Sequence, residues 1–334
     1  MKLVGAASEA SRLSILDWLA FVVGRREAIV DVARSRMAIW VGLLFVLSAG
    51  LAREYDGVYL LGEPWHLVLP LAASLATSLL LYALIYSAKW AHALDQLGWW
   101  SGYRTLLTFY WFTAPLAWLY AIPVERFLTP ADAMQANLAF LAIVSVWRVL
   151  LITRVLSMWL GASYWAMLWV VLFFAVSVAI ILATVTPTPI WDIMGGIRLP
   201  EREQFILDVK LTIWFFGVPL WFVLGFGACY VMYMRETPWS LTAVDGRSAL
   251  AVGISLWSFA AILLAAGLIL LPISQPAQKR AWQVDRYLVE GEVASAIDLM
   301  AHLPREAFPP HWNPPPHPAY GQEDGPNVVE VLIA

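Results

Sequence analysis

The sequence predicts an all-α protein: a polytopic bundle of transmembrane helices with a small helical tail at the C-terminus. Of its 334 residues, 61% are hydrophobic and 13% are charged, whereas a soluble domain carries about 25% charged residues. The mean hydropathy is +0.70. The apolar residues form long runs without the alternation of strands. Because backbone groups in a bilayer must bond internally, such runs predict membrane-spanning helices, and the lipid bilayer is the first expected partner.

The N-terminal region, residues 1–36, has an apolar part too short to span a membrane, followed by several arginines. One interpretation is an amphipathic helix in the interface, with its arginines toward anionic headgroups. The other is a soluble helix packed under the membrane domain. The region lacks the short basic start of a cleavable signal peptide, so we expect the first long apolar run to be an uncleaved anchor.

The predicted membrane domain, residues 37–273, contains seven apolar segments. They cover residues 37–52, 66–88, 105–124, 134–158, 163–186, 211–234 and 250–273. Six reach the roughly 20 residues that a span requires. The first, between Arg36 and Arg53, is shorter and crosses only if both arginines snorkel. If it dips in and returns instead, six spans remain; hydropathy favours seven, and the distribution of Lys and Arg favours six.

Two prolines interrupt these segments. Pro115 lies in the third segment and Pro219 in the sixth, and each is expected to kink its helix. Kinks can line a cavity, although prolines are also common in membrane helices without a special role.

Two arginines lie in the fourth segment, within the sequence AIVSVWRVLLITRVLSMWLG. No Asp or Glu falls inside any of the seven segments to pair with Arg148 or Arg154. Counted from the start of the segment, Arg154 reaches the membrane boundary and Arg148 lies within snorkelling range of it. We therefore interpret both as cytoplasmic anchors, and keep Arg148 as the candidate functional charge.

The C-terminal tail, residues 274–334, has a different composition. It predicts a helix pair over 278–303 broken near Gly291, a proline-rich strut over 304–319 and a terminal segment over 320–334. A single helix pair cannot bury its own apolar face, so we expect a protein partner or the membrane domain to cover it. The candidate partner-binding residues are Trp282, Leu288, Ile297 and Trp312.

The sequence carries none of the phosphate-loop, dinucleotide-binding or zinc-protease motifs. The single cysteine excludes an intrachain disulfide, and the net charge of −3 gives no reason to expect nucleic-acid binding. We expect no catalytic residue, cofactor or metal. The sequence favours a non-enzymatic scaffold that binds partners, with a transporter or channel-like subunit as the alternative and an intramembrane enzyme less favoured. The expected location is a bacterial inner membrane with the N-terminus in the cytoplasm; the oligomeric state stays open.

Three stretches, GYRTLLTFYWFTAPLAWLYAI, VWRVLLITRVL and SYWAMLWVVLFFAVSVAII, resemble the Yip family of multi-span membrane proteins. The matching positions are Gly102, Tyr103, Pro115, Arg148 and Arg154, within about residues 37–186. The resemblance implies a helical membrane domain and, for bacterial members, no defined activity. The last two predicted spans and the tail have no counterpart in the family pattern.

Overall fold

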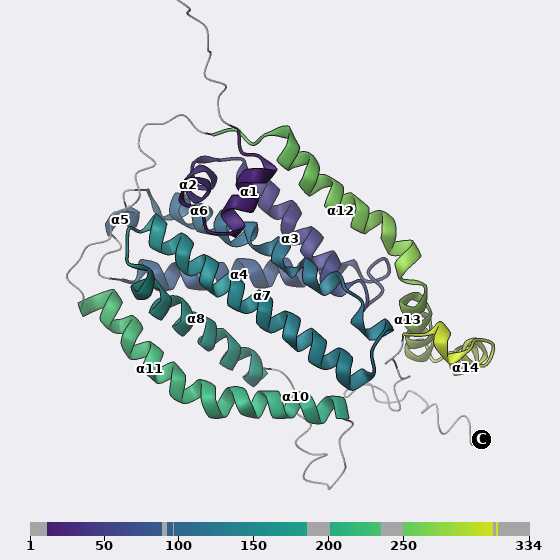
Figure 1. Cartoon of the computed structure of the whole chain (residues 1–334). Coiled ribbons are helices and arrows are strands. Elements are labelled where there is room, and N and C mark those ends of the chain that lie inside the picture. The colour runs from purple at the N-terminus through teal and green to yellow at the C-terminus, as the bar shows by residue number, and fades with distance from the viewer. Residues whose placement is uncertain are drawn as a thin grey trace, which may run out of the picture.

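The computed structural model describes residues 12–88, 92–95, 97–185, 201–234, 250–309 and 312. Within these ranges every regular element is a helix, and extended backbone pairs only in one bridge, between Leu13 and Val252. Figure 1 shows the long helices running side by side, with the helical tail projecting from one end. The all-α class is therefore confirmed.

Two short helices begin the described chain, α1 (Ile15–Val22) and α2 (Arg26–Arg34). Ser14 and Asp17 form a capping box that fixes the start of α1. Gly24, with φ of 75°, makes the tight turn into α2. Trp18 and Phe21 of α1 are buried in the bundle, and Trp18 Nε1 donates to the carbonyl of Phe112 at 3.2 Å. This region thus packs into the helical domain.

The first half of the domain is built around α3 (Ala38–Glu54), which packs against α6, the following 3₁₀ helix and α12. A 3₁₀ turn (η1, Pro64–Leu67) leads into α4 (Val68–Tyr86), and the short α5 (His92–Asp95) precedes α6 (Trp99–Phe112). Pro115 cannot donate a backbone hydrogen bond, and the chain continues past α6 as a 3₁₀ helix (η2, Ala114–Ala121). A further 3₁₀ turn (η3, Val124–Arg126) follows.

The second half contains the longest helices, and Figure 1 shows α7 crossing in front of α4 while α8 lies beside α11. They are α7 (Pro130–Trp159), α8 (Tyr164–Val185), α10 (Glu201–Thr212), α11 (Val218–Cys229) and α12 (Ile254–Ser274). A π-helical turn, η4 (Ile213–Gly217), joins α10 to α11, and a second, η5 (Tyr230–Met234), extends α11, so that one continuous helix runs over Gln204–Met234. Pro219 lies two residues after the end of the first π turn, which accommodates its missing donor. The helix therefore begins before the predicted segment 211–234.

Five helices of the described chain are long and apolar enough to cross a membrane: Pro64–Tyr86, Asp132–Trp159, Tyr164–Val185, Gln204–Met234 and Ile254–Ser274. The pair α2 and α3 bends by 107° and makes a sixth if it counts as one span. The predicted third span is divided between α6 and η2. A membrane-embedded helical protein is thus supported, and the seventh crossing stays a prediction.

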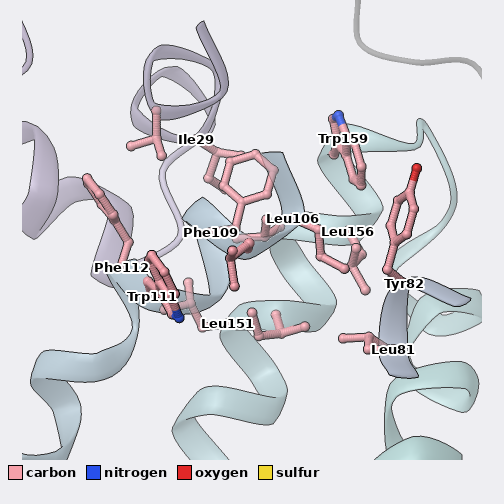
Figure 2. Close-up of a cluster of buried hydrophobic side chains, with 14 of the residues drawn as sticks. Ile29, Leu81, Tyr82, Leu106, Phe109, Trp111, Phe112, Leu151, Leu156 and Trp159 are labelled. Carbon is pink, nitrogen blue, oxygen red and sulfur yellow. The ribbon is translucent and has the colours of Figure 1, made fainter. Parts of the chain in front are cut away.

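The main hydrophobic core lies where α1 and α2 pack against α3, α6 and α7. Figure 2 shows Phe109 and Phe112 of α6 meeting Ile29 of α2, with Leu151 and Leu156 of α7 beside them. Phe21 stacks on Phe109 with ring centroids 6.2 Å apart. Large buried aromatic rings therefore fix α1 and α2 to this end of the bundle.

The tail begins directly after α12 and consists of α13 (Pro276–Val289), α14 (Val293–Ala301) and a 3₁₀ turn (η6, Arg305–Ala307). Gly291, with φ of 79°, turns the chain between the two helices. Val284, Ala296 and Phe308 form a small separate core. The predicted terminal segment 320–334 and most of the proline-rich strut lie outside the described residues.

Candidate functional site

A cavity of about 1900 Å³ lies among α4, α7, α8 and α10, and the tail helix α13 lines one end of it. Its walls are mainly apolar. The side chains of α7 and α8 that form them include Leu138, Leu141, Val171, Phe174, Val178 and Leu182. We call this space the α7–α8 cavity.

Arg148 of α7 is a charged side chain in the cavity wall that residues of another helix hold in place. Its Nε donates to Thr113 Oγ1 at 3.1 Å, and its guanidinium carbon lies 4.8 Å from the centre of the Tyr110 ring. Among the described residues no carboxylate forms an ion pair with Arg148, and its two terminal nitrogens donate to no described residue. Within the described part of the chain, Arg148 therefore presents to the cavity a guanidinium that is held in place and has no ion-pair partner.

The end of α6, just before Pro115, provides the two residues that position this arginine, Thr113 and Tyr110; we call them the seat of Arg148. Thr113 is fully buried at the end of α6, and its hydroxyl donates to the Tyr110 carbonyl at 2.7 Å while accepting from Arg148. The Tyr110 hydroxyl lies 3.1 Å from Thr77 Oγ1 of α4. Two helices, α4 and α6, thus hold the ring and the hydroxyl that position the guanidinium.

Three further cations line the cavity, Lys210, Arg53 and Arg286, together with four acidic residues, Asp56, Glu63, Asp285 and Glu290. Lys210 is 8% exposed on α10; it lies just before the predicted apolar segment 211–234 and was not among the predicted site residues. Its position just before a long apolar run was the available signal, because that run continues the same helix. Arg53 lies at the end of α3, with its guanidinium carbon 5.8 Å from the Tyr120 ring centre, and the charges of Arg53 and Arg148 both act on Tyr120.

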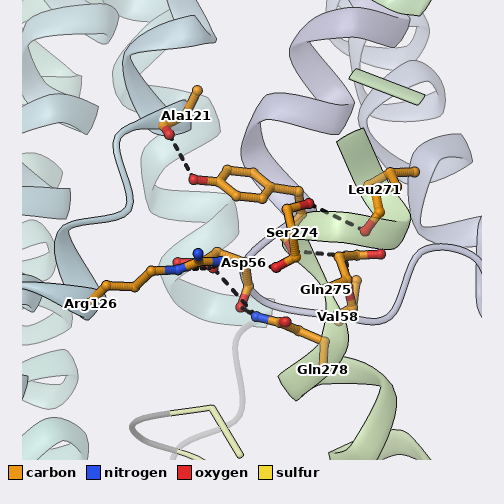
Figure 3. Close-up of polar contacts among 9 residues, drawn as sticks. Asp56, Val58, Ala121, Arg126, Leu271, Ser274, Gln275 and Gln278 are labelled. Carbon is orange, nitrogen blue, oxygen red and sulfur yellow. Dashed lines mark hydrogen bonds and ion pairs between the residues drawn. The ribbon is translucent and has the colours of Figure 1, made fainter. Parts of the chain in front are cut away.

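Figure 3 shows how the start of the tail is tied to the loop after α3. Gln275 is 1% exposed; its Nε2 donates to the carbonyls of Tyr55 and Val58 at 2.8 and 2.6 Å, and its Oε1 accepts from the Leu60 amide at 3.2 Å. Gln278 donates to the Asp56 carbonyl at 2.9 Å. These buried bonds fix the direction in which α13 leaves the bundle.

An ion pair reinforces this junction. Arg126 donates to Asp56 at 2.6 Å and to the Ser274 carbonyl at 3.1 Å. The loops that follow α3 and η2 therefore meet the end of α12 at one end of the molecule (Figure 3).

The tail contributes an aromatic and acidic rim to the cavity. Trp282 packs on Tyr59 with ring centroids 5.5 Å apart. Burial raises the pKa of the Asp285 carboxyl above its usual value; a hydrogen bond from Trp312 opposes this shift, and the negative charge of Glu63 adds to it. One carboxylate oxygen of Asp285 is buried without a hydrogen-bond partner among the described residues.

The structure separates the two arginines that the sequence grouped together. Arg148 lies about 17 Å from the end of α7, whereas Arg154 lies about 8 Å from it, at 1.5 Å per residue. Arg154 does not line the cavity; its Nε is 3.4 Å from the Gly24 carbonyl.

The other predicted residues are spread over the tail and two interrupted helices. Trp282 and Trp312 line the cavity rim, and Leu288 packs against the tail core. Ile297 is half-buried on α14 and takes no part in the cavity. Pro115 adjoins the seat of Arg148, and Pro219 lies in the helix that carries Lys210.

Among the described residues, no group of three His, Cys, Asp or Glu side chains is arranged to hold a metal ion. Comparisons of the chain with known protein families, with curated proteins and with solved structures give no match.

Proposed function

We propose that this chain is a non-enzymatic integral membrane protein that binds an amphiphilic ligand in the α7–α8 cavity. The observation that carries the proposal is the seat of Arg148, a positive charge held by Thr113 and Tyr110 against a large apolar cavity. Intramembrane charges usually face a bundle interior and mark functional sites. A hydroxyl and an aromatic ring that hold a guanidinium in place suit binding more than proton transfer.

The proposal includes seven crossings of a bacterial inner membrane with the N-terminus in the cytoplasm. Its support is that α6 and η2 together run over Trp99–Ala121, so the broken helix has the length of a span. The loops joined by Arg126 and Gln275 would then lie with the tail on the opposite side from α2.

Cavity filling tests ligand binding. Ala179 of α8 lines the cavity, so Ala179→Trp should displace the ligand. Ile181, two residues on, is 56% exposed and does not line it, so Ile181→Trp is the matched control. Native mass spectrometry of the full chain, released from gentle detergent, should show co-purified small molecules in the wild type and in the control. No bound molecule in any variant, or equal binding in all three, contradicts the proposal.

Transport is a second candidate, favoured by the irregular helices beside the cavity. The π turn before Pro219 begins at Ile213, which lines the cavity, and the break at Pro115 adjoins Arg148. Such interruptions can act as hinges. Reconstituted liposomes that show ligand flux abolished by Ala179→Trp would favour transport over simple binding.

Partner binding through the tail is the other candidate. The tail is fixed to the membrane domain by Gln275 and Gln278 and leaves Ile297 of α14 half-exposed. A photo-crosslinking residue at Ile297 in the full chain, compared with one at the buried Ala296, tests whether a protein contacts this face. The absence of any Ile297-specific adduct in cells argues against a scaffold.

A further inference from the structure

We infer that the ligand of the α7–α8 cavity carries a phosphate headgroup, that the phosphate binds Arg148, and that its apolar chains lie against α7 and α8. This inference rests on the proposed function and names the chemistry of its ligand. It is carried by the donors of Arg148, the composition of the cavity walls and the size of the cavity.

Arg148 has donors that no described residue uses. Thr113 Oγ1 accepts a hydrogen bond from Nε of Arg148, and the two terminal nitrogens donate to no described residue. A guanidinium held in an apolar setting without an anion is costly, because burying a charge requires a partner. A phosphate offers paired oxygens that match the planar fork of arginine, whereas a neutral hydroxyl or carbonyl satisfies fewer donors.

The arginine is also held in place before any ligand arrives. Thr113 is 0% exposed and is itself bonded to the Tyr110 carbonyl, while the Tyr110 ring lies 4.8 Å from the guanidinium carbon. Less side-chain freedom is therefore lost on binding, which favours affinity. The other ionic side chains of the lining are of both signs, so Arg148 alone carries the assignment of the phosphate.

The walls and volume argue for an amphiphile rather than a free anion. The volume of about 1900 Å³ is about twice the upper end of pockets that hold drug-sized ligands. The wall formed by α8 consists of Val, Phe, Ala and Leu side chains. Inorganic phosphate would leave this apolar surface uncovered, whereas acyl or prenyl chains would bury it.

The test uses the full chain, purified and delipidated in detergent. Phosphatidic acid, diacylglycerol with the same acyl chains, and inorganic phosphate are added separately, and bound ligand is measured by native mass spectrometry. Arg148→Gln removes the charge, and Arg154→Gln is the matched control because it lies on the same helix but outside the cavity. We expect Arg148→Gln to weaken phosphatidic acid binding roughly tenfold or more, and Arg154→Gln to leave it unchanged.

The outcomes separate this inference from the proposed function. Preference for phosphatidic acid over diacylglycerol, lost in Arg148→Gln and kept in Arg154→Gln, supports the inference. If both lipids bind equally, and binding falls in Ala179→Trp but not in Arg148→Gln, the claim of a phosphate headgroup is overturned. The proposal that a ligand binds in the cavity then still stands. If inorganic phosphate binds as tightly as phosphatidic acid, the claim that the ligand is an amphiphile is overturned. Lipid binding unaffected by Ala179→Trp places the lipid outside the cavity and overturns both proposals.

Discussion

At the scale of single residues, the environment separates side chains that look alike in the sequence. Arg148 and Arg154 lie on the same helix, and both have mainly apolar neighbours along the chain. Arg148 is seated by Thr113 and Tyr110, and Arg154 reaches the Gly24 carbonyl. Both contacts join residues distant in sequence, so depth counting along the segment could not distinguish the two roles.

Gly102 illustrates a residue whose lack of a side chain is required by its neighbour. A Cβ atom at Gly102 would collide with the hydroxyl of Tyr82, whose side chain is fully buried. We expect Gly102→Ala to lower the free energy of unfolding by about 1–3 kcal/mol, because overpacking forces a shift of a rigid ring. Denaturant unfolding in detergent micelles would measure the change.

The control for Gly102 is Gly217→Ala in the second half of the domain. A Cβ atom there meets Ile180 Cγ1 at 3.7 Å, an ordinary contact. This variant should be neutral or slightly stabilising, since alanine is the better helix former. Equal losses in both variants would contradict a specific clash with Tyr82.

Asp285 supplies a prediction for pH dependence. Its folded-state pKa is raised, so the neutral acid is favoured in the folded tail. Protonated Asp285 therefore contributes to the stability of the folded tail at pH values below the unfolded pKa, and this contribution is lost as pH rises through the folded pKa. We expect Asp285→Asn to slow hydrogen exchange in α13 at pH 7, and the difference from wild type to shrink as pH falls toward the usual range of an aspartic acid.

Exchange rates for this comparison are corrected for the intrinsic pH dependence of each amide. Asp298→Asn is the control, because that carboxylate lies on α14 with its side chain 74% exposed. A change that is the same for both substitutions, or independent of pH, would rule out burial of Asp285 as the cause.

At the scale of elements, the sequence predicts helices well where apolar runs are long and less well where they are interrupted. The fourth and fifth predicted segments, 134–158 and 163–186, correspond closely to α7 and α8. The third segment is divided at Pro115, because proline cannot continue the backbone ladder of α6. The helix through Lys210 begins earlier than predicted, since its first turns are charged and hydropathy alone assigns them to a loop.

The junction between α12 and the tail depends on one buried amide. Gln275 bonds to the carbonyls of Tyr55 and Val58 and to the Leu60 amide. Gln275→Ala leaves these buried groups unpaired, and we expect the tail to open more easily by about 2–4 kcal/mol. Hydrogen exchange of α13 and α14 in the full chain should become faster, while α7 and α8 stay protected.

A matched control for this junction is Gln283→Ala. Gln283 lies on α13, is half-buried and, among the described residues, makes no hydrogen bond to the loop after α3. In this variant the hydrogen exchange of α13 and α14 should stay close to that of the wild type. Unchanged tail exchange in Gln275→Ala would show that the ion pair of Arg126 with Asp56 holds the junction without the amide.

At the scale of the whole molecule, composition predicts a membrane protein, whereas long-range contacts decide where the cavity lies and how the helices pack. The candidate cavity needs side chains from α4, α6, α7, α8, α10 and the tail, which no local pattern brings together. The same holds for α1 and α2, whose Trp18, Phe21 and Ile29 look like interfacial residues in sequence but are buried in the bundle. Hydropathy indicates that a residue is apolar, but it does not distinguish a residue that faces lipid from one that is buried in the protein.

The contacts between distant loops make the topology testable. Because Gln275 and Arg126 join the loops after α3 and η2 to the end of α12, these loops and the tail share one side of the membrane. With seven crossings α2 lies on the opposite side, whereas with six crossings both termini lie on the same side. The exposed positions Glu27 in α2, Gly57 after α3 and Glu292 in the tail therefore discriminate between the two counts.

Single cysteines at these three positions, in a Cys229→Ser background because Cys229 is exposed, provide the measurement. With seven crossings and a cytoplasmic N-terminus, a membrane-impermeant maleimide added to intact spheroplasts should label Gly57→Cys and Glu292→Cys. Glu27→Cys should react only after permeabilisation. Equal protection of all three in intact spheroplasts would establish six crossings and place the rim of the cavity in the cytoplasm. A phosphate-bearing amphiphile would then reach Arg148 past the tail from the cytoplasmic leaflet, so the same labels also decide which leaflet supplies the ligand.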